Sequence, residues 1–379
     1  MTKSLHIGPI SDVELQTLET CQNYPIRTIG HIQPHGILLV LKSSSLSITQ
    51  ASANTNSALG LSPEDLLGKS LTSIFPDEEV EDLRTCLRES DNFGVRTLTA
   101  RITGEQFYIY LHLQQDIILL ELEPVRTDAF DLESLQRQIS QMTTVFEKTT
   151  TILELSQRLA KEIRALINFD RVMIYQFLSD QSGIVIAEET HTGIESYLGL
   201  HYPATDIPAE ARAVFTENPL RCIPDINYSP APIIQADKSL TQKPLDISAT
   251  WLRGVAPAHV EYLKNMVVVS SLTMPLLDES GLWGLISCHH SQPTYTTAET
   301  RSILVLLSKV ASLNLFRQQQ LERNVYREQR NCFLTDLKAA RKQDDASLQQ
   351  VLIQNSQLLL DVFKSEGLAF IFEQDITIV

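Results

Sequence analysis

The chain has 379 residues and a formal net charge of -15 at pH 7. Hydrophobic residues make up 43% and charged residues 20%, which is typical of a globular chain and excludes a disordered or fibrous one. The negative charge disfavours a nucleic-acid partner, and no apolar stretch approaches the roughly 20 residues of a membrane span. Because residues 1–8 have no signal-peptide core, we expect a cytoplasmic protein with no membrane partner.

The first third of the chain predicts a small mixed domain. Strands are expected at residues 36–42, 46–51, 95–102, 107–113 and 117–122. Ser62 is an N-cap serine followed by Pro63, which predicts a short helix that ends near Leu67. We place this domain at residues 20–125, after an extension (1–19) and before a linker (126–150).

The middle of the chain predicts a second sheet flanked by helices, at residues 151–318. Apolar residues at helical spacing indicate a helix over 152–166, and strands are expected at residues 171–177, 183–188, 267–277 and 282–289. Between 198 and 257 the periodicity is lost in a proline-rich stretch, with one helix at 209–215. A loop of this length is usually functional or disordered.

The last part, residues 319–379, predicts a connecting helix and the start of a third domain. The helical pattern runs from about Thr297 to Phe363, and residues 368–372 and 376–379 predict two strands with nothing after them to complete a sheet. The fold class is therefore α+β, with two antiparallel sheets, each flanked by helices, and a long C-terminal helix.

The chain has five scattered cysteines and no C-x-x-C pair: Cys21, Cys86, Cys222, Cys288 and Cys332. An odd, dispersed set fits reduced thiols better than a disulfide framework or a zinc site. We therefore expect no metal centre.

Asp206 lies between Pro203 and Pro208, whose rings fix the backbone so that its carbonyls and the carboxylate face a ligand. The alternative for this segment is a capped turn that leads into the helix at Ala209.

Six sequence runs together resemble the photosensory part of phytochromes. They are IQPHG (32–36), FDRVMIY (169–175), HYPATDIP (201–208), RGVAPAHVEYLKNM (253–266), SSLT (270–273) and LWGLISCHH (282–290). The first resembles the phytochrome PAS domain and the others its GAF domain, in the family's order and spacing. The resemblance implies that a knot joins the two domains, in which the loop between Cys222 and Leu252 wraps around the segment before His31. It also implies that the chain stops just inside the PHY domain.

The resemblance further implies a covalent bilin. In plant and cyanobacterial phytochromes the attachment cysteine precedes the GAF histidine, and that position is Ala258 here. In the bacterial type it lies upstream of the Gln-Pro-His-Gly run, where this chain has Cys21. Cys21 is therefore expected to add autocatalytically to ring A of biliverdin and form a thioether. Outside this family, Cys21 would be an inert thiol in a tail.

The resemblance assigns the remaining cofactor-binding residues. They are Tyr175, Tyr202, Asp206, Ile207, Pro208, Arg221, Arg253, His259, Tyr262, Ser271, Thr273 and His289. The two arginines suit the propionates because guanidinium groups pair with carboxylates, and the two hydroxyl residues are expected at the second propionate. The alternatives are solvated loop arginines and strand residues that serve packing.

Polar contacts to the pyrrole rings are expected from three of these residues. The backbone carbonyl of Asp206 would accept the pyrrole N–H groups, His259 would help hold the cationic ligand and relay protons, and His289 would bond the ring D carbonyl. His290 is expected to be structural. The three tyrosines would line the rings, or else belong to an ordinary core.

The implied function is a red/far-red photoreceptor that switches by isomerisation of the bond between rings C and D. Implied partners are a second copy, paired through the C-terminal helix, and a downstream signalling module or response regulator. We expect no enzyme activity, since the family's histidine kinase is not in this sequence, and we expect an imperfectly stabilised far-red state with near-infrared fluorescence. The sequence departs from the family pattern at Thr205, Phe215 and Val267, where serine, tyrosine and glycine are frequent.

Two other functions stay open at this point. One is a GAF domain that binds a cyclic nucleotide or another small regulator, with Cys21 idle. The other is an enzyme fragment that uses cysteine and histidine, which is disfavoured because no nucleophile, base and orienting group are visible together.

Overall fold

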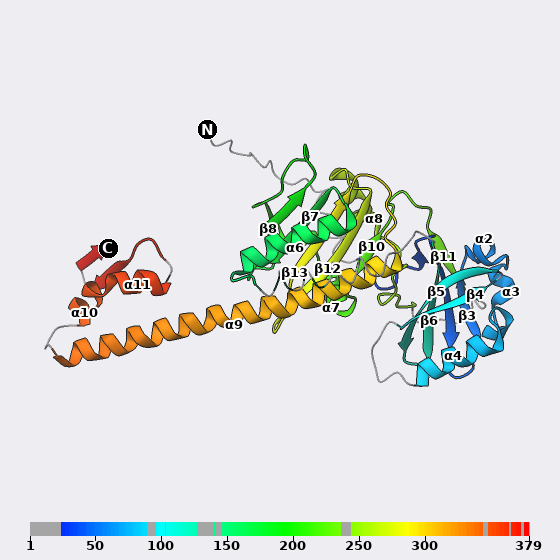
Figure 1. Cartoon of the computed structure of the whole chain (residues 1–379), viewed down its shortest axis with the longest axis horizontal. Helices are drawn as coiled ribbons and strands as arrows, with labels where there is room; N and C mark the ends of the chain where they lie inside the picture. The colour runs from blue at the N-terminus through cyan, green and yellow to red at the C-terminus, as the bar shows by residue number, and fades with distance from the viewer. Residues whose placement is uncertain are drawn as a thin grey trace. The chain divides into compact units, whose positions relative to one another are not determined.

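The computed structural model describes residues 24–88, 96–102, 104–126, 148–235, 244–343, 348–363, 365–372 and 375–378, with residues 140, 142, 144 and 146 (Figure 1). The chain divides into two compact units. The first comprises residues 1–149 and 153–312, and the second comprises residues 150–152 and 313–379. Cys21 lies outside the described residues.

A seven-stranded sheet lies in the first unit, in the order β1-β11-β3-β2-β6-β5-β4. Its strands are β1 (His31–Ile32), β2 (Ile37–Lys42), β3 (Ile48–Ser52), β4 (Arg96–Ile102), β5 (Glu105–Gln114), β6 (Ile117–Pro124) and β11 (Ala231–Gln235). All neighbouring strands are antiparallel. The five strands predicted for this region are confirmed, with ends that differ by at most two residues where both are described, whereas β1 and β11 were not predicted.

Short helices pack against one face of this sheet and enclose a continuous apolar core (Figure 1). They are α2 (Thr55–Leu59), α3 (Pro63–Leu66) and α4 (Asp77–Arg88), with the 3-10 turn η1 (Leu71–Ser73). The predicted cap of α3 is confirmed, because the Ser62 hydroxyl accepts a hydrogen bond from the Asp65 N–H at 3.2 Å. The sequence does not predict α2 and α4, whose apolar positions are few.

A second, six-stranded antiparallel sheet has the order β10-β12-β13-β7-β8-β9. Its strands are β7 (Arg171–Phe177), β8 (Gly183–Thr190), β9 (His201–Tyr202), β10 (Arg221–Ile223), β12 (Ser270–Asp278) and β13 (Gly281–His290). Its helices are α6 (Ile152–Ile167), η2 (Ala204–Asp206), α7 (Ala209–Glu217) and α8 (Pro257–Asn265). The expected strand start at Val267 is wrong, because Val267 has a positive φ of 57° and follows α8.

Strand β1 is bonded on both of its edges to segments that lie between β10 of the second sheet and α8. On one edge β1 pairs with β11, which itself pairs with β3. On the other edge the Gln33 N–H donates to the Leu252 carbonyl at 2.7 Å, and the Gly254 N–H donates to the His31 carbonyl at 3.0 Å. This arrangement agrees with the predicted knot, although residues 236–243 of the loop lie outside the described part.

The long helix α9 (Ala298–Gln343) starts in the first unit and extends into the second. The second unit also contains α10 (Leu348–Gln354), α11 (Ser356–Phe363) and the hairpin of β14 (Ala369–Phe372) and β15 (Asp375–Ile378). The helical prediction is confirmed, with breaks, and within the described residues the two last strands pair only with each other. None of the helices described has both the length and the apolar character that a membrane crossing requires.

Candidate ligand-binding site

A cavity of about 310 Å³ opens in the first unit, within the size range of small-molecule sites. Every predicted site residue that the structure describes lines this cavity: Tyr175, Tyr202, Asp206, Ile207, Pro208, Arg221, Arg253, His259, Tyr262, Ser271, Thr273 and His289. Tyr24 and Ile26, shortly after Cys21 in sequence, also line it. The structure therefore brings residues of well-separated sequence runs to one place.

Two prolines shape the segment that carries Asp206. Pro203 precedes η2 with φ -67° and Pro208 precedes α7 with φ -56°. Neither helix has a side-chain cap, so Asp206 does not cap the helix that follows. Its carboxylate is half-buried at the cavity, and burial raises its pKa.

Two arginines place positive charge in the cavity wall, and their guanidinium groups bond to backbone carbonyls. The Arg221 guanidinium donates to the carbonyls of Arg253 and Gly254 at 2.6 and 2.7 Å, and Arg253 donates to the Ile26 carbonyl at 3.1 Å. Within the described chain, neither forms an ion pair with a carboxylate. Burial lowers the pKa of Arg221 to about 10, and burial with the charge of Arg221 lowers the pKa of Arg253 to about 9. Arg253 is only 8% exposed, so it is not a solvated loop residue. Buried cations of this kind favour an anionic ligand.

Two histidines in the wall have lowered pKa values and differ in exposure, since His289 is buried whereas the His259 side chain is exposed. Desolvation and the charge of Arg221 lower the pKa of His259 to about 4, and burial and the charge of Arg171 lower the pKa of His289 to about 3. The Ser287 hydroxyl lies 3.1 Å from His289 Nε2, whereas His289 Nδ1 is buried without a hydrogen-bond partner. Buried nitrogen atoms are usually hydrogen-bonded, and a bound ligand can supply the missing partner of His289 Nδ1.

His290 has a different environment and does not line the cavity. Its Nδ1 lies 3.1 Å from the Asp170 carboxylate, and its ring packs against Phe169. These contacts agree with the structural role expected for it. In the described residues, no three His, Cys, Asp or Glu side chains are grouped to hold a metal ion.

Three tyrosines from separate elements form an aromatic part of the wall. The rings of Tyr175 and Tyr202 lie 6.0 Å apart, and the ring of Tyr262 stacks on His259 with centroids 6.1 Å apart. Burial, followed by the charge of Asp206, raises the pKa of Tyr175 to about 12. These phenols therefore remain protonated and can donate hydrogen bonds.

Cross-strand register places the hydroxyl residues beside the charged ones. Thr273 of β12 is opposite Arg221 of β10 and Ser287 of β13, and Ser271 is opposite His289. Directly opposed side chains on one sheet face lie within contact distance. The sheet thus presents one row with a guanidinium and two hydroxyls, and a second row with a hydroxyl and an imidazole.

Sequence reasoning missed several lining residues, including Tyr24, Ile26, Met173, Val185, Glu210 and Ser287. Strand alternation predicts Ser287 from His289, since residues two apart face the same side. Nothing in the sequence identifies the apolar residues. Two of the departures from the family pattern, Thr205 and Phe215, also line the cavity.

Comparison with known proteins gives matches along most of the chain. The PAS fold model matches residues 21–125 and the GAF domain model matches residues 151–315. Cyanobacterial phytochrome B of Nostoc sp. is 35% identical over 360 residues, covering 94% of this chain and 48% of the relative. The bacteriophytochrome of Xanthomonas campestris is 34% identical, covering 95% of this chain and 57% of the relative. The chain thus spans about half the length of these curated relatives.

Solved structures show the same similarity in three dimensions. The chromophore-binding domain of Stigmatella aurantiaca phytochrome P1 superposes with a TM-score of 0.71 and 37% identity, covering 77% of this chain and 98% of that one. The photosensory core module of the same phytochrome superposes with a TM-score of 0.82 and 34% identity, covering 95% and 72%.

Proposed function

The chain belongs to the bacteriophytochrome family, and on this premise we propose that it is a red/far-red light-sensing module whose GAF cavity holds covalently attached biliverdin. One observation carries the proposal: within the described residues, the cavity combines two guanidinium groups, which form no ion pair, with histidines and tyrosines. Propionates suit the guanidinium groups, and a conjugated ring system with polar edges suits the histidines and tyrosines.

The fit of this ligand rests on polar atoms that lack partners. Arg253 Nε and His289 Nδ1 are both buried without a hydrogen bond. A propionate would satisfy the first atom and a ring carbonyl the second. With Nε2 accepting from the Ser287 hydroxyl, His289 Nδ1 carries the proton and donates.

Covalent attachment at Cys21 is supported by the path of the chain. Tyr24 lines the cavity, and three residues span at most about 11 Å, so the chain is long enough for a thiol at position 21 to reach a ligand there. In the proposed addition the Sγ–C bond forms across a carbon–carbon double bond of ring A, and the thiol proton goes to the other carbon.

When bound, biliverdin supplies light absorption and rotation about the bond between rings C and D. The residues of the chain supply the two sets of contacts that distinguish the states. We assign the Asp206 carbonyl to the pyrrole N–H groups, His259 to the neighbouring ring edge and His289 to the ring D carbonyl. A ligand that favours different contacts in two geometries shifts the protein between two states.

We further propose that α9 transmits the signal and pairs with a second copy of the chain. It carries large apolar side chains that are exposed along its length: Leu306, Leu313, Leu321, Val325, Tyr326 and Leu334. Such a surface favours a helical partner. A downstream signalling module would complete the pathway.

The proposal is tested by mixing the purified chain with biliverdin. We expect a coloured adduct that survives denaturation and fluoresces with zinc in a gel, and a reversible absorption difference after red illumination. Cys21→Ser should abolish the covalent signal, whereas Cys332→Ser, at an exposed position on α9, should not change it. A chain that binds no biliverdin would overturn the proposal. The alternative of a nucleotide-type sensor is not favoured, because the similar proteins are phytochromes across both domains.

A further inference from the structure

Strand β6 of the PAS sheet carries two fully buried carboxylates on one face. Glu121 is 0% exposed and Glu123 is 2% exposed, and residues two apart on a strand point to the same side. Neither lines the cavity. Burying a carboxylate lowers the stability of the fold unless hydrogen-bond donors surround it. The donors that surround each glutamate therefore indicate which part of the chain it holds in place.

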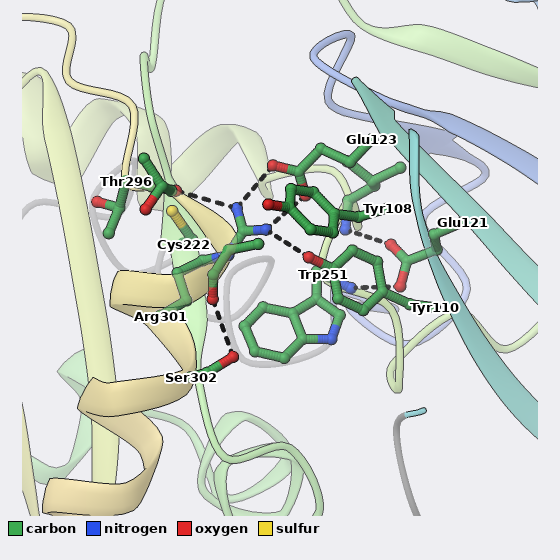
Figure 2. Close-up of polar contacts among 12 residues, drawn as sticks. Tyr108, Tyr110, Glu121, Glu123, Cys222, Trp251, Thr296, Arg301 and Ser302 are labelled. Carbon is green, nitrogen blue, oxygen red and sulfur yellow. Dashed lines mark hydrogen bonds and ion pairs between the residues drawn. The ribbon is translucent and has the colours of Figure 1, made fainter. Parts of the chain in front are cut away.

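Glu121 holds the backbone of the GAF loop, the segment between Cys222 and Leu252. Its Oε1 accepts from the Trp251 N–H at 3.1 Å and its Oε2 accepts from the Leu252 N–H at 2.7 Å. His112 Nε2 lies 2.6 Å from the same Oε1. Figure 2 shows the carboxylate of Glu121 directed at the backbone beside Trp251. One side chain thus fixes two consecutive peptide groups, in a low-dielectric setting where such bonds are strong.

The fixed peptides lead directly into the anion-binding part of the cavity. Arg253 follows Leu252 in sequence, and its side chain lines the cavity. The carbonyls of Arg253 and Gly254 hold the guanidinium of Arg221 at 2.6 and 2.7 Å. Both ligand-facing guanidinium groups therefore depend on the course of the backbone at residues 252–254.

Glu123 holds a different element. It accepts two hydrogen bonds from Arg301 of α9, at 2.9 and 2.5 Å, and Arg301 also donates to the Tyr110 hydroxyl at 3.0 Å (Figure 2). The two carboxylates share a strand, a face and full burial, but of the two only Glu121 accepts hydrogen bonds from the loop backbone. Glu123 reaches the loop indirectly, through Arg301, whose guanidinium lies 5.3 Å from the Trp251 ring. Glu123 therefore serves as a matched control for the loss of a buried carboxylate.

We propose that Glu121 is a positioning residue of the cavity, which sets Arg253 and Arg221 for the carboxylates of the ligand from outside the cavity wall. The inference depends on the proposed function for the choice of biliverdin as the anionic ligand. Glu121→Gln keeps the shape but turns one acceptor into a donor that opposes a backbone N–H. The loop then relaxes, and the guanidinium pair loses its fixed spacing.

The test compares biliverdin with its dimethyl ester, whose propionates carry no charge. All variants carry Cys21→Ser so that binding is reversible. We expect Glu121→Gln to raise the Kd for biliverdin about tenfold and to leave the Kd for the diester unchanged, since only the charged ligand uses the arginines. Glu123→Gln should preserve the ratio of the two Kd values. A change of equal size for both ligands in Glu121→Gln, or no change, overturns the proposal.

Hydrogen–deuterium exchange separates this inference from the ligand assignment. In the ligand-free chain, Glu121→Gln should speed exchange of the amides at 251–254 at least tenfold more than Glu123→Gln does, and equal exchange overturns the proposal even if no biliverdin binds. If Glu121→Gln does not fold, a second measurement uses the chain that keeps Glu121. Biliverdin should then slow exchange at 251 and 252 more than its diester does, because coupling between two sites is reciprocal, and equal slowing overturns the proposal.

Discussion

Replacing Val267 with glycine should stabilise the GAF domain. Val267 has φ 57° and directly follows the C-cap of α8. The Val268 N–H donates to the Leu263 carbonyl and the Val267 N–H donates to the Lys264 carbonyl, both at 2.9 Å. This is the Schellman pattern that ends many helices, in which the left-handed position is usually glycine. Valine is strained there because its β-branched side chain disfavours positive φ.

The size of the effect follows from three contributions. A left-handed conformation costs an ordinary residue about 1–2 kcal/mol, and glycine removes this cost. Glycine also makes the unfolded chain more flexible, which lowers the stability of the folded state by about 0.4–1 kcal/mol. The Val267 side chain is 77% exposed, so its removal loses little apolar burial. The free energy of unfolding should therefore rise by about 1 kcal/mol.

Urea denaturation followed by far-UV circular dichroism measures this gain in Val267→Gly and Val267→Ala. Alanine keeps the Cβ atom and should recover less than half of it. A glycine variant less stable than the original chain, or an alanine variant equal to the glycine variant, would refute the assignment of strain to this backbone angle.

Three further outcomes follow from the cavity wall. Arg253→Met removes a buried charge that forms no ion pair within the described residues, so the ligand-free chain should stay about as stable in thermal melts. The variant should weaken biliverdin binding tenfold or more in absorbance titrations, and a large loss of stability would contradict the absence of an ion pair. Gly183→Ala should displace the Tyr175 ring, since a Cβ there would lie 1.9 Å from its Cζ, and the absorption maximum of the biliverdin adduct should shift; an unchanged spectrum would show that the ring does not contact the ligand. Because the pKa of the buried His289 is lowered to about 3, the unfolded chain binds more protons than the folded chain below pH 6.5. The ligand-free chain should therefore lose up to about 1.4 kcal/mol per pH unit as the pH falls from 6.5 to 4. Urea midpoints at pH 7, 6 and 5 check the sign, and a midpoint that does not fall would contradict it.

Local signals predicted much of the fold. Alternating apolar residues located most strands of both sheets, and the serine–proline start located α3. Helix α8 was missed because its segment begins inside a proline-rich stretch. The start of β12 was misplaced because apolar residues 267–269 resemble strand, although a helix end occupies them. Short-range patterns do not distinguish these cases.

The cavity residues were predictable because the family resemblance names them, and the structure adds their grouping. The roles of Glu121 and Glu123 were not predictable, since alternating glutamates at the end of a strand indicate a solvent-facing edge. Their partners are far away in sequence: Arg301 lies 178 positions after Glu123, and Leu252 lies 131 positions after Glu121. Only the assembled fold shows that these charges are buried and satisfied.

Strand β11 belongs to the GAF loop yet pairs with β3 of the PAS sheet. Without it, β3 would present a row of unpaired N–H and C=O groups, and such an edge recruits strands from other molecules. The sequence limits of the PAS domain are therefore poor limits for excision. A fragment that ends after β6 would expose this edge and tend to assemble through intermolecular sheets, whereas one that continues beyond Gln235 retains its covering strand.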